Sequence, residues 1–389
     1  MTAVISQAVT APEVTARGAS ANGVRLIATY ATTHGIAEFV TALTLFSLLS
    51  MGRISGVQIV VYSVIAFGCP IALAALASLQ KSLSEGYVGL AGAILLATGL
   101  VLPQLGWAAV LLLGVGSATF HIAAGTATLK LPRRGMAVGV FESSGAIGLA
   151  AGTVLGGGAW SLASTSVWAG VAAVVVVAGG LAVLRWGSAG VRRTTGEADP
   201  AGYGLSAQLT DAMVGCPRPR RSDWTIVNAR NSLPAMGLLV LAAVSLMRSI
   251  VGFAAPEPWK GGAAMVMWAA VVVMLGRALG GIIADRWGGF APAMVGFVGA
   301  AVFMGLWPGA IWAGLLGAFC LALPMAPVIL AMVSCTRRPS ISFGLAQLFQ
   351  VPAALTLGIV MSGWAVFAVL LVGAVLVLAM RPYDERTIK

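Results

Sequence analysis

The sequence predicts an all-α polytopic membrane protein with twelve transmembrane helices arranged as two pseudo-symmetric six-helix bundles. Three observations predict this class: the composition, the lengths of the apolar runs, and one long polar stretch near the middle of the chain. Hydrophobic residues make up 59% of the 389 residues and charged residues 9%, whereas a soluble domain carries about 25% charged residues. The 50 glycines agree with this class, because glycine is common in membrane helices.

The same composition excludes other classes of protein. Too few charged residues are present to cover a water-facing surface, which excludes a soluble enzyme, a disordered chain and a disulfide scaffold. No Ser/His/Asp arrangement, phosphate-binding loop or zinc-type spacing is found in the sequence, so we expect no enzyme, no cofactor and no resident metal ion. The net charge of +11 does not indicate nucleic-acid binding, because Lys and Arg lie in short tracts between apolar runs.

Apolar runs of about 20 residues can cross the hydrocarbon core of a bilayer. Twelve runs are predicted to do so, at residues 26–50, 56–79, 86–103, 107–128, 136–158, 165–184, 236–255, 261–284, 291–306, 308–333, 341–363 and 364–380. A polar stretch separates the first six spans from the last six. The predicted parts are therefore an N-terminal tail, an N-terminal bundle, a central loop, a C-terminal bundle and a C-terminal tail, at residues 1–25, 26–186, 187–235, 236–380 and 381–389.

The distribution of basic residues predicts the orientation of these spans. Of the 23 Lys and Arg residues, 19 fall on the side of the chain ends and the central loop, whereas only Arg53 and Lys260 fall on the other side. Arg248 and Arg277 lie inside spans. Because cytoplasmic loops carry the excess of basic residues, we expect a multi-pass protein of the cell (inner) membrane with both termini and the central loop in the cytoplasm.

Residues 276–289 read GRALGGIIADRWGG and resemble the loop signature that the major facilitator superfamily carries after its eighth span. The resemblance implies the fold of that family and a gating role for the motif residues Gly276, Arg277, Gly281, Asp285, Arg286 and Gly288. Small residues permit close helix approach, and Asp285 is expected to face the positive N-terminus of span 5. The equivalent segment after span 2 has Ser78 at the acidic position, so the first copy of the signature is degenerate.

A narrower resemblance covers span 1 and spans 4 and 5. Residues 114–121 (GVGSATFH) and 134–148, with Phe141, Gly145 and Gly148, are similar to the fosmidomycin-resistance branch of that superfamily. That branch also has a histidine and an acid four residues apart in span 1, as His34 and Glu38 are here. Ile122 and Ala123 replace the proline and acid that usually follow the span 4 histidine. The resemblance implies a monomeric antiporter that performs proton-driven efflux, without fixing the substrate.

Polar residues inside the spans cluster near the predicted midplane. At about 1.5 Å of rise per residue, they lie roughly 12–20 Å from the cytoplasmic ends of their helices. Two internal segments also correspond, since GVFE at 139–142 in span 5 matches QLFQ at 347–350 in span 11. Secondary transporters bind substrates and ions at this depth, between two repeated halves. The candidate residues are His34, Glu38, His121, Glu142, Arg248, Gln347 and Gln350.

We assign proton coupling to Glu142, Glu38 and His34, because burial disfavours the charged forms of such side chains and sets them up to exchange protons. His34 and Glu38 share one helix face and are expected to pair. Glu142 needs a partner on another helix, and His121 has a similar depth.

The remaining midplane residues are assigned to the substrate. Arg248 keeps its charge, so it must meet a carboxylate, backbone carbonyls or an anionic substrate. Together with His121, Gln347 and Gln350 it forms the expected substrate-binding set.

The function predicted from these residues is secondary active transport by alternating access, with proton-coupled export of a small polar or anionic compound. The expected partners are that small molecule, protons and the lipid bilayer. Two alternatives remain open. One is a proton-coupled importer of a nutrient or a transition-metal ion, since two histidines and two glutamates suit a metal. The other is a transporter-like membrane assembly factor or sensor, which the degenerate first-half signature favours.

Overall fold

The computed structural model describes residues 13–79, 84–131, 133–158, 170–171, 173–182, 184, 233–255, 262–351 and 360–380, with side chains from residue 23 onward in the first helix. Most of the predicted central loop and the last nine residues lie outside the described residues. All regular structure within the described part of the chain is helical.

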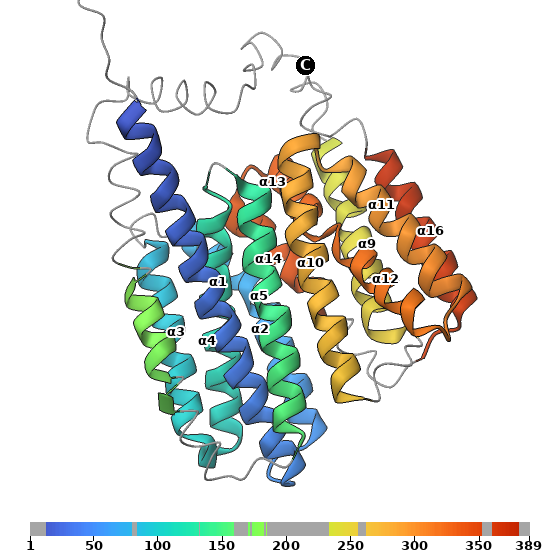
Figure 1. Ribbon diagram of the computed structural model, residues 1–389. Helices are drawn as coiled ribbons and strands as arrows, with labels where there is room; N and C mark the ends of the chain where they lie inside the picture. Colours follow the sequence, from blue (N-terminus) through green and yellow to red (C-terminus); the bar gives the residue numbers. More distant parts are fainter. Residues whose placement is uncertain are drawn as a thin grey trace, which may run out of the picture.

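The N-terminal half consists of long, mostly apolar helices that alternate in direction (Figure 1). They are α1 (Glu13–Ser50), α2 (Gly56–Leu79), α3 (Glu85–Val101), the short 3₁₀ turn η1 (Pro103–Leu105), α4 (Trp107–Thr128), α5 (Arg134–Gly156) and an apolar helix at Ala173–Ala182. The polar residue Ser84 precedes α3, and Gly106 precedes α4, at points where the chain must turn. Each predicted span of this half coincides with one of these helices.

The C-terminal half has more interrupted helices. They are α9 (Leu233–Ala254), α10 (Ala263–Trp287), α11 (Phe290–Ala300) continued by the π-helical η4 (Ala301–Gly305), α12 (Ile311–Ala322), α13 (Met325–Thr336), α14 (Pro339–Leu348) and α16 (Gly363–Ala379). The predicted tenth span is broken between α12 and α13 at Pro324, as expected for a residue that cannot donate a helical hydrogen bond.

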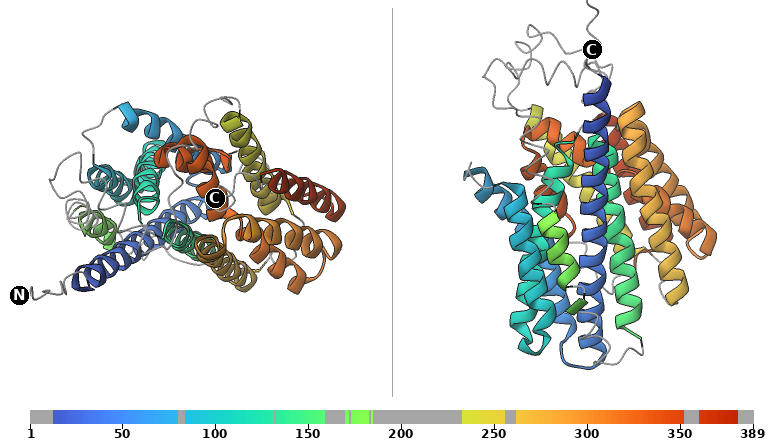
Figure 2. Two further views of the ribbon diagram at one scale, coloured as in Figure 1. Left: turned by 90° about the horizontal axis from the view of Figure 1, so that it is seen from above. Right: turned by 60° about the vertical axis from the view of Figure 1, so that its left-hand side comes forward.

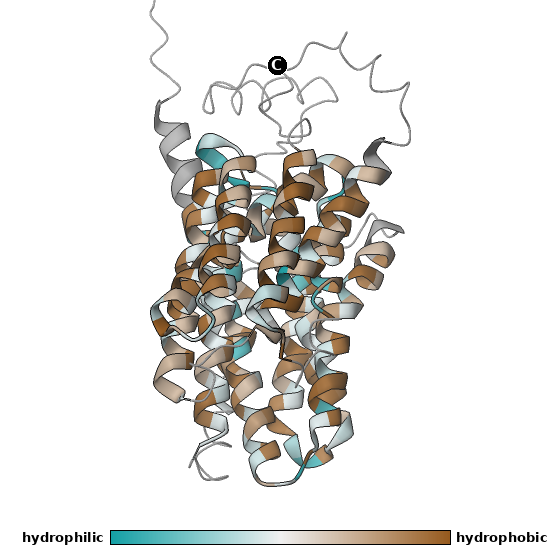
Figure 3. Ribbon diagram, turned by 90° about the vertical axis from the view of Figure 1, so that its right-hand side faces the viewer, coloured by the Kyte–Doolittle hydropathy of each residue, from teal (hydrophilic) through white to brown (hydrophobic). Residues whose placement is uncertain are grey.

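Helix α1 extends into the predicted N-terminal tail, because it begins at Glu13. Its stretch that is long and apolar enough to cross a membrane is Gly23–Ser50, close to the predicted span at 26–50. Within the described residues, six helices are long and apolar enough to cross a membrane by themselves, and most other predicted spans correspond to shorter apolar helices. Figure 3 shows hydrophobic residues along the helices, with hydrophilic residues at their ends and in patches at mid-height.

Glycine contacts set how closely the helices approach. A Cβ atom on Gly148 of α5 would lie 2.1 Å from the carbonyl oxygen of Gly35 in α1, within the N-terminal half. A Cβ atom on Gly281 of α10 would lie 2.1 Å from the carbonyl oxygen of Gly135 in α5, across the two halves. The end-on view in Figure 2 shows α5 and α10 side by side at this boundary. Backbone therefore meets backbone between the halves.

Candidate functional site

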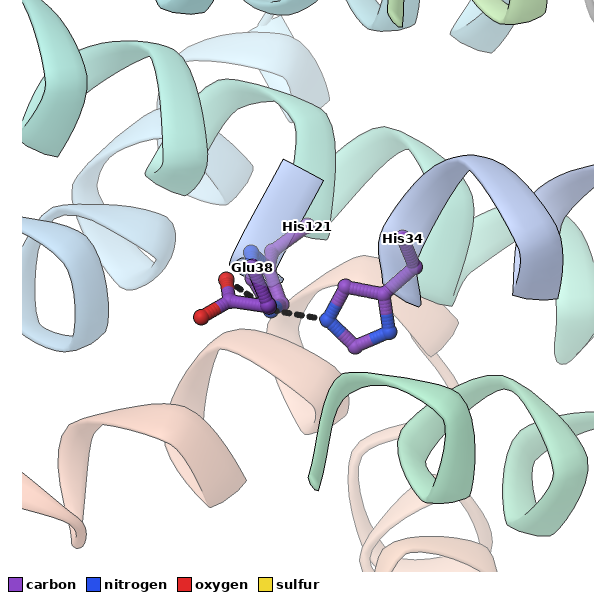
Figure 4. Close-up of side chains that lie close together, drawn as sticks. All are labelled: His34, Glu38 and His121. Carbon is purple, nitrogen blue, oxygen red and sulfur yellow. Dashed lines mark hydrogen bonds and ion pairs between the residues drawn. The ribbon is translucent and has the colours of Figure 1, made fainter. Parts of the chain in front are cut away.

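The buried charged residues form two clusters, of which the first lies within the N-terminal half. We call His34, Glu38, Ser117 and His121 the histidine cluster (Figure 4). Nε2 of His34 lies 2.8 Å from Nε2 of His121, and the same His121 nitrogen lies 3.7 Å from Oε1 of Glu38. The Ser117 hydroxyl donates to Glu38 over 3.4 Å. Helices α1 and α4 thus supply all four side chains.

Helix α5 seats the His34 ring. Nδ1 of His34 lies 2.8 Å from the carbonyl oxygen of Phe141, and the two rings stack with centroids 4.2 Å apart. A Cβ atom on Gly145 would come within 2.3 Å of His34 Cε1. Any larger residue at this position would displace the imidazole, so glycine is required here.

The second cluster joins the two halves, and we call Glu142, Arg277, Gln347 and Gln350 the inter-half cluster. Arg277 of α10 lies 3.6 Å from Oε2 of Glu142 and donates to the Glu142 carbonyl oxygen over 2.7 Å. Gln347 of α14 donates to Oε1 of Glu142 over 2.9 Å, and Gln350 donates to Gln347 over 2.6 Å. Because Glu142 belongs to α5, two C-terminal helices hold one N-terminal carboxylate.

A second arginine lies beside this cluster. Arg248 of α9 is within electrostatic range of Arg277 and Glu142, yet no described residue is found in a hydrogen bond or ion pair with it. Nε of Arg277 is also buried without a hydrogen-bond partner among the described residues. Arg277 is thus paired with the Glu142 carboxylate, Arg248 lies within its electrostatic range, and both guanidinium groups retain donors that the described residues leave unused.

The expected contact between Asp285 and span 5 is confirmed. The Asp285 carboxylate accepts hydrogen bonds from the backbone amides of Gly135 and Met136, over 2.9 and 2.8 Å. These amides open α5, where a helix has unpaired donors and a positive dipole end. Together with the contact between Gly281 and Gly135, this carboxylate holds the halves together at this end.

Other residues of the gating motif have separate structural tasks. A Cβ atom on Gly276 would lie 2.4 Å from the carbonyl oxygen of Phe319, so this glycine lets α10 pack on α12. Gly288 ends α10 with a φ of 90°, a value that suits glycine. Arg286 is exposed.

These contacts correct two expected pairings and add to one expected role. Glu142 pairs with Arg277 and Gln347 rather than with His121. His34 meets His121 and not Glu38, although His34 and Glu38 share a helix face. Arg277 belongs to the inter-half cluster in addition to the gating motif, because its long side chain reaches from α10 to Glu142.

Three residues of the histidine cluster or in contact with His34 were given no site role from the sequence. Ser117, Phe141 and Gly145 all lie in the segments that carry the narrower family resemblance. A serine one turn before His121 was an available signal, since residues four apart on a helix are neighbours.

The arrangement was compared with known proteins. No protein-family model and no curated protein sequence matches the chain. Among solved structures, the chain is similar to the proton:xylose symporter XylE of the major facilitator superfamily, bound to 6-bromo-6-deoxy-D-glucose, at 13% identity and a TM-score of 0.62. That match covers 93% of this chain and 95% of XylE.

A second similar structure is a variant of the Escherichia coli fucose:proton symporter FucP, at 14% identity and a TM-score of 0.56. It covers 94% of this chain and 100% of FucP. The chain therefore has the fold of these two symporters, the major facilitator fold. Six helices in the described part of the chain are long and apolar enough to cross a membrane.

Proposed function

We propose that this protein is a proton-coupled secondary transporter that works by alternating access and carries a small anionic or polar compound. The inter-half cluster is the observation that carries the proposal. In alternating access two halves rock about a binding site near the midplane. Glu142 belongs to one half, and its partners Arg277 and Gln347 belong to the other. Rocking must stretch or break these bonds in every cycle.

Protonation of Glu142 is the proposed coupling step. A proton on this carboxylate removes its negative charge, whereas the facing Arg277 and Arg248 stay positive. The ion pair between the halves then weakens, and separation of α5 from α10 becomes easier. The other groups that face Glu142 are the neutral amide of Gln347 and, at longer range, the carboxyl group of Glu38. Proton occupancy and conformation are thereby linked.

An anion is the substrate class that the charges favour. Arg248 and Arg277 carry two positive charges against the single carboxylate of Glu142, and Nε of Arg277 has an unused donor. A phosphonate, phosphate or carboxylate would accept charge-assisted hydrogen bonds from both guanidinium groups. We therefore assign the substrate to these two arginines with Gln350 nearby. His121 belongs to the histidine cluster and is left out of this set.

The sign of the coupling follows from the same charges. A proton on Glu142 increases the positive charge around the arginines, so a proton and an anion bind together more readily than either alone. The proton and the anion then cross the membrane together in the same direction, which is co-transport. Export in exchange for protons, which the sequence resemblance implied, instead requires substrate and proton to exclude each other.

The second candidate is export of a polar compound in exchange for protons. It is favoured by the hydrogen bond between Gln347 and Glu142. A substrate that replaces the Gln347 amide as donor to the ionised Glu142 carboxylate would compete with the proton. The two candidates therefore differ in how the substrate and the proton affect each other's binding.

The orientation and the domain boundaries belong to the same proposal. We place both termini and residues 187–235 on the cytoplasmic side, because almost all basic residues outside the spans gather there. The end of the molecule closed by Asp285 is then the cytoplasmic end. A reporter fused after Lys389 that is active only in the cytoplasm tests this orientation.

The function is tested with purified protein and a panel of probes: the phosphonate fosmidomycin, simple organic anions and neutral sugars. Thermal shift at acidic and alkaline pH identifies a binder, and its flux is then measured in proteoliposomes under pH gradients of either sign. We expect an anion to bind, and its flux to depend on the gradient in the unchanged protein and in Glu85→Gln. Glu142→Gln should lose this dependence, and Arg248→Gln should bind the probe at least tenfold more weakly.

Two outcomes contradict the proposal. Full gradient-driven flux in Glu142→Gln excludes this residue from coupling. Binding of the probe that is weakened by protons supports exchange in place of co-transport. Transport of the same probe in right-side-out and inside-out vesicles then gives the direction.

A further inference from the structure

The histidine cluster has no part in the proposed coupling step, yet it gathers three metal-ligating groups. One ligand atom each from His34, His121 and Glu38 lies within 4.8 Å of the other two, and all three residues are buried. Figure 4 shows the His34 ring and the Glu38 carboxylate on either side of one His121 nitrogen, which both of them approach. All three residues belong to the N-terminal half, so rocking between the halves leaves their arrangement intact.

Backbone contacts favour one tautomer of each histidine, with the hydrogen on Nδ1. Nδ1 of His34 faces the carbonyl oxygen of Phe141 at 2.8 Å, and Nδ1 of His121 faces that of Ser117 at 2.9 Å. A carbonyl oxygen only accepts, so each Nδ1 carries the donated hydrogen and each Nε2 of a neutral ring presents a lone pair. Two lone pairs 2.8 Å apart repel each other unless a positive species lies between them.

We propose that His34, His121 and Glu38 form a binding site for a divalent transition-metal ion of the zinc, cobalt or nickel class. Two imidazole nitrogens and one carboxylate oxygen suit these ions, and such a set leaves a coordination position open. Metal-ligating histidines usually donate their other N–H to a carbonyl or carboxylate group. Both histidines do so here. This proposal departs from the expectation from sequence that no metal is held.

The distances between the three ligand atoms are close to those that a bound metal ion would impose. A tetrahedral ion with metal–nitrogen bonds of about 2.0–2.1 Å holds its two nitrogens roughly 3.3 Å apart. The rings therefore need to separate by about half an ångström, which small side-chain rotations supply. Oε1 of Glu38 lies 3.7 Å from Nε2 of His121, too far for a hydrogen bond but suitable for a third ligand of a common ion.

A single proton between the histidines is the competing explanation. Such a proton would also separate the two lone pairs. In addition, the Ser117 hydroxyl lies 3.2 Å from Nδ1 of His121, and donation from it would let Nε2 of His121 carry the hydrogen. In that case the cluster is a hydrogen-bonded histidine pair. The experiment must therefore detect the metal directly.

The test is a titration of the full-length protein in detergent with Co²⁺ as a spectroscopic probe. The affinity tag must lack histidine, because the chain has only two histidines and both lie in the cluster. We expect visible bands of a tetrahedral Co²⁺ complex at one ion per chain, displaced by Zn²⁺ and unaffected by Mg²⁺. Zn²⁺ should also raise the unfolding temperature, because a ligand that binds only the folded state stabilises it.

Matched variants identify the ligands. His34→Gln, His121→Gln and Glu38→Gln should each weaken Co²⁺ binding at least tenfold, while Cys335→Ser, which removes a half-buried thiol elsewhere, should leave the spectrum unchanged. Size-exclusion profiles and unfolding temperatures without metal report whether each variant is folded. X-ray absorption of the Zn²⁺-loaded wild type gives a second measurement that needs no variant, since it detects imidazole ligands directly.

Three results overturn the metal site. They are absence of Co²⁺ bands and of Zn²⁺ stabilisation in the wild type, binding that survives in His34→Gln and His121→Gln, and Zn²⁺ ligands without imidazole in the absorption spectrum. The first leaves a hydrogen-bonded histidine pair. Each result is independent of transport, so failure of the metal site and failure of the proposed function can be told apart.

Discussion

The histidine cluster and the inter-half cluster both lie in the predicted midplane region, but they connect different bodies. Among the described residues, the hydrogen bonds and close contacts of His34, Glu38 and His121 lie within the N-terminal half, in α1, α4 and α5. Glu142 and Arg277 bond across the boundary between the halves. A cluster within one half keeps its geometry while the halves rock, and suits a stable binding site. A cluster across the boundary changes in every cycle, and suits coupling.

Arg277→Gln should give the largest change in stability, because it leaves Glu142 buried without its counter-ion. Removing one partner of a buried ion pair costs about 3–5 kcal/mol. The double variant Arg277→Gln with Glu142→Gln should recover part of this loss, since the carboxylate that Arg277 neutralised is then absent, while Arg248 keeps its charge. Thermal unfolding of the wild type and the three variants measures the difference. Equal unfolding temperatures for the single and double variants would show that the pair does not stabilise this conformation.

Gly281→Val should act on the boundary and spare the histidine cluster. A Cβ atom at residue 281 would lie 2.1 Å from the carbonyl oxygen of Gly135, where neither backbone can yield easily. Overpacking costs about 1–3 kcal/mol, which lowers the population of the conformation closed at this end roughly tenfold to a hundredfold. Flux of the identified probe should fall accordingly, while Co²⁺ binding persists.

The control for this variant is Gly56→Ala, because a Cβ atom at Gly56 of α2 meets nothing within 4 Å. Its flux should equal that of the wild type. Normal flux in Gly281→Val would mean that contact between α5 and α10 at this point is not needed for transport.

The sequence predicted the fold, and it predicted a common depth for the site residues without predicting most of their partners. Depth follows from the rise along a helix and needs no knowledge of packing. The internal correspondence between residues 139–142 and 347–350 matched Glu142 with Gln350, and in the structure Gln350 donates to Gln347, which donates to Glu142. Arg277, eight residues before Asp285, lies about 12 Å further from the helix end. Its midplane position was therefore available from the sequence.

Partners depend on how each helix is rotated, and glycine contacts between helices set this rotation. His34 and Glu38 share a face of α1, so the sequence favoured a pair between them. The contacts of Gly148 with Gly35 and of Gly145 with His34 turn α1 and α5 so that His34 bonds to Phe141 instead. The helical period of 3.6 residues shows which residues share a face of a helix, but it does not show which neighbouring helix that face contacts.

Gly145→Ala should weaken the histidine cluster and spare the boundary. The added methyl group would lie 2.3 Å from Cε1 of His34, so the ring must move away from Phe141 and from His121. Displacing a supporting contact of a metal ligand typically costs about tenfold to a hundredfold in metal affinity. Co²⁺ titration of this variant measures the loss. An unchanged spectrum and affinity would indicate that the ion does not use His34.

The smallest effect is expected at the ion pair of Glu85 and Lys130, which joins the start of α3 to the end of α4. The side chains of Glu85 and Lys130 are 31% and 49% exposed, so water and salt screen their attraction. Such a pair contributes about 0–1 kcal/mol. Lys130→Gln should therefore change the unfolding temperature only slightly, and this small change should vanish in high salt.

Probe flux and Co²⁺ affinity should both remain at wild-type values in Lys130→Gln, since both residues lie in one half and outside both clusters. This variant removes a charge away from the boundary between the halves. It therefore shows whether the effect of Glu142→Gln depends on the position of the charge. If the flux of Lys130→Gln lost its dependence on the pH gradient, as that of Glu142→Gln is expected to, position relative to the boundary would not be what distinguishes a coupling charge from a structural one. Coupling would then have to be assigned to the summed charge of the protein.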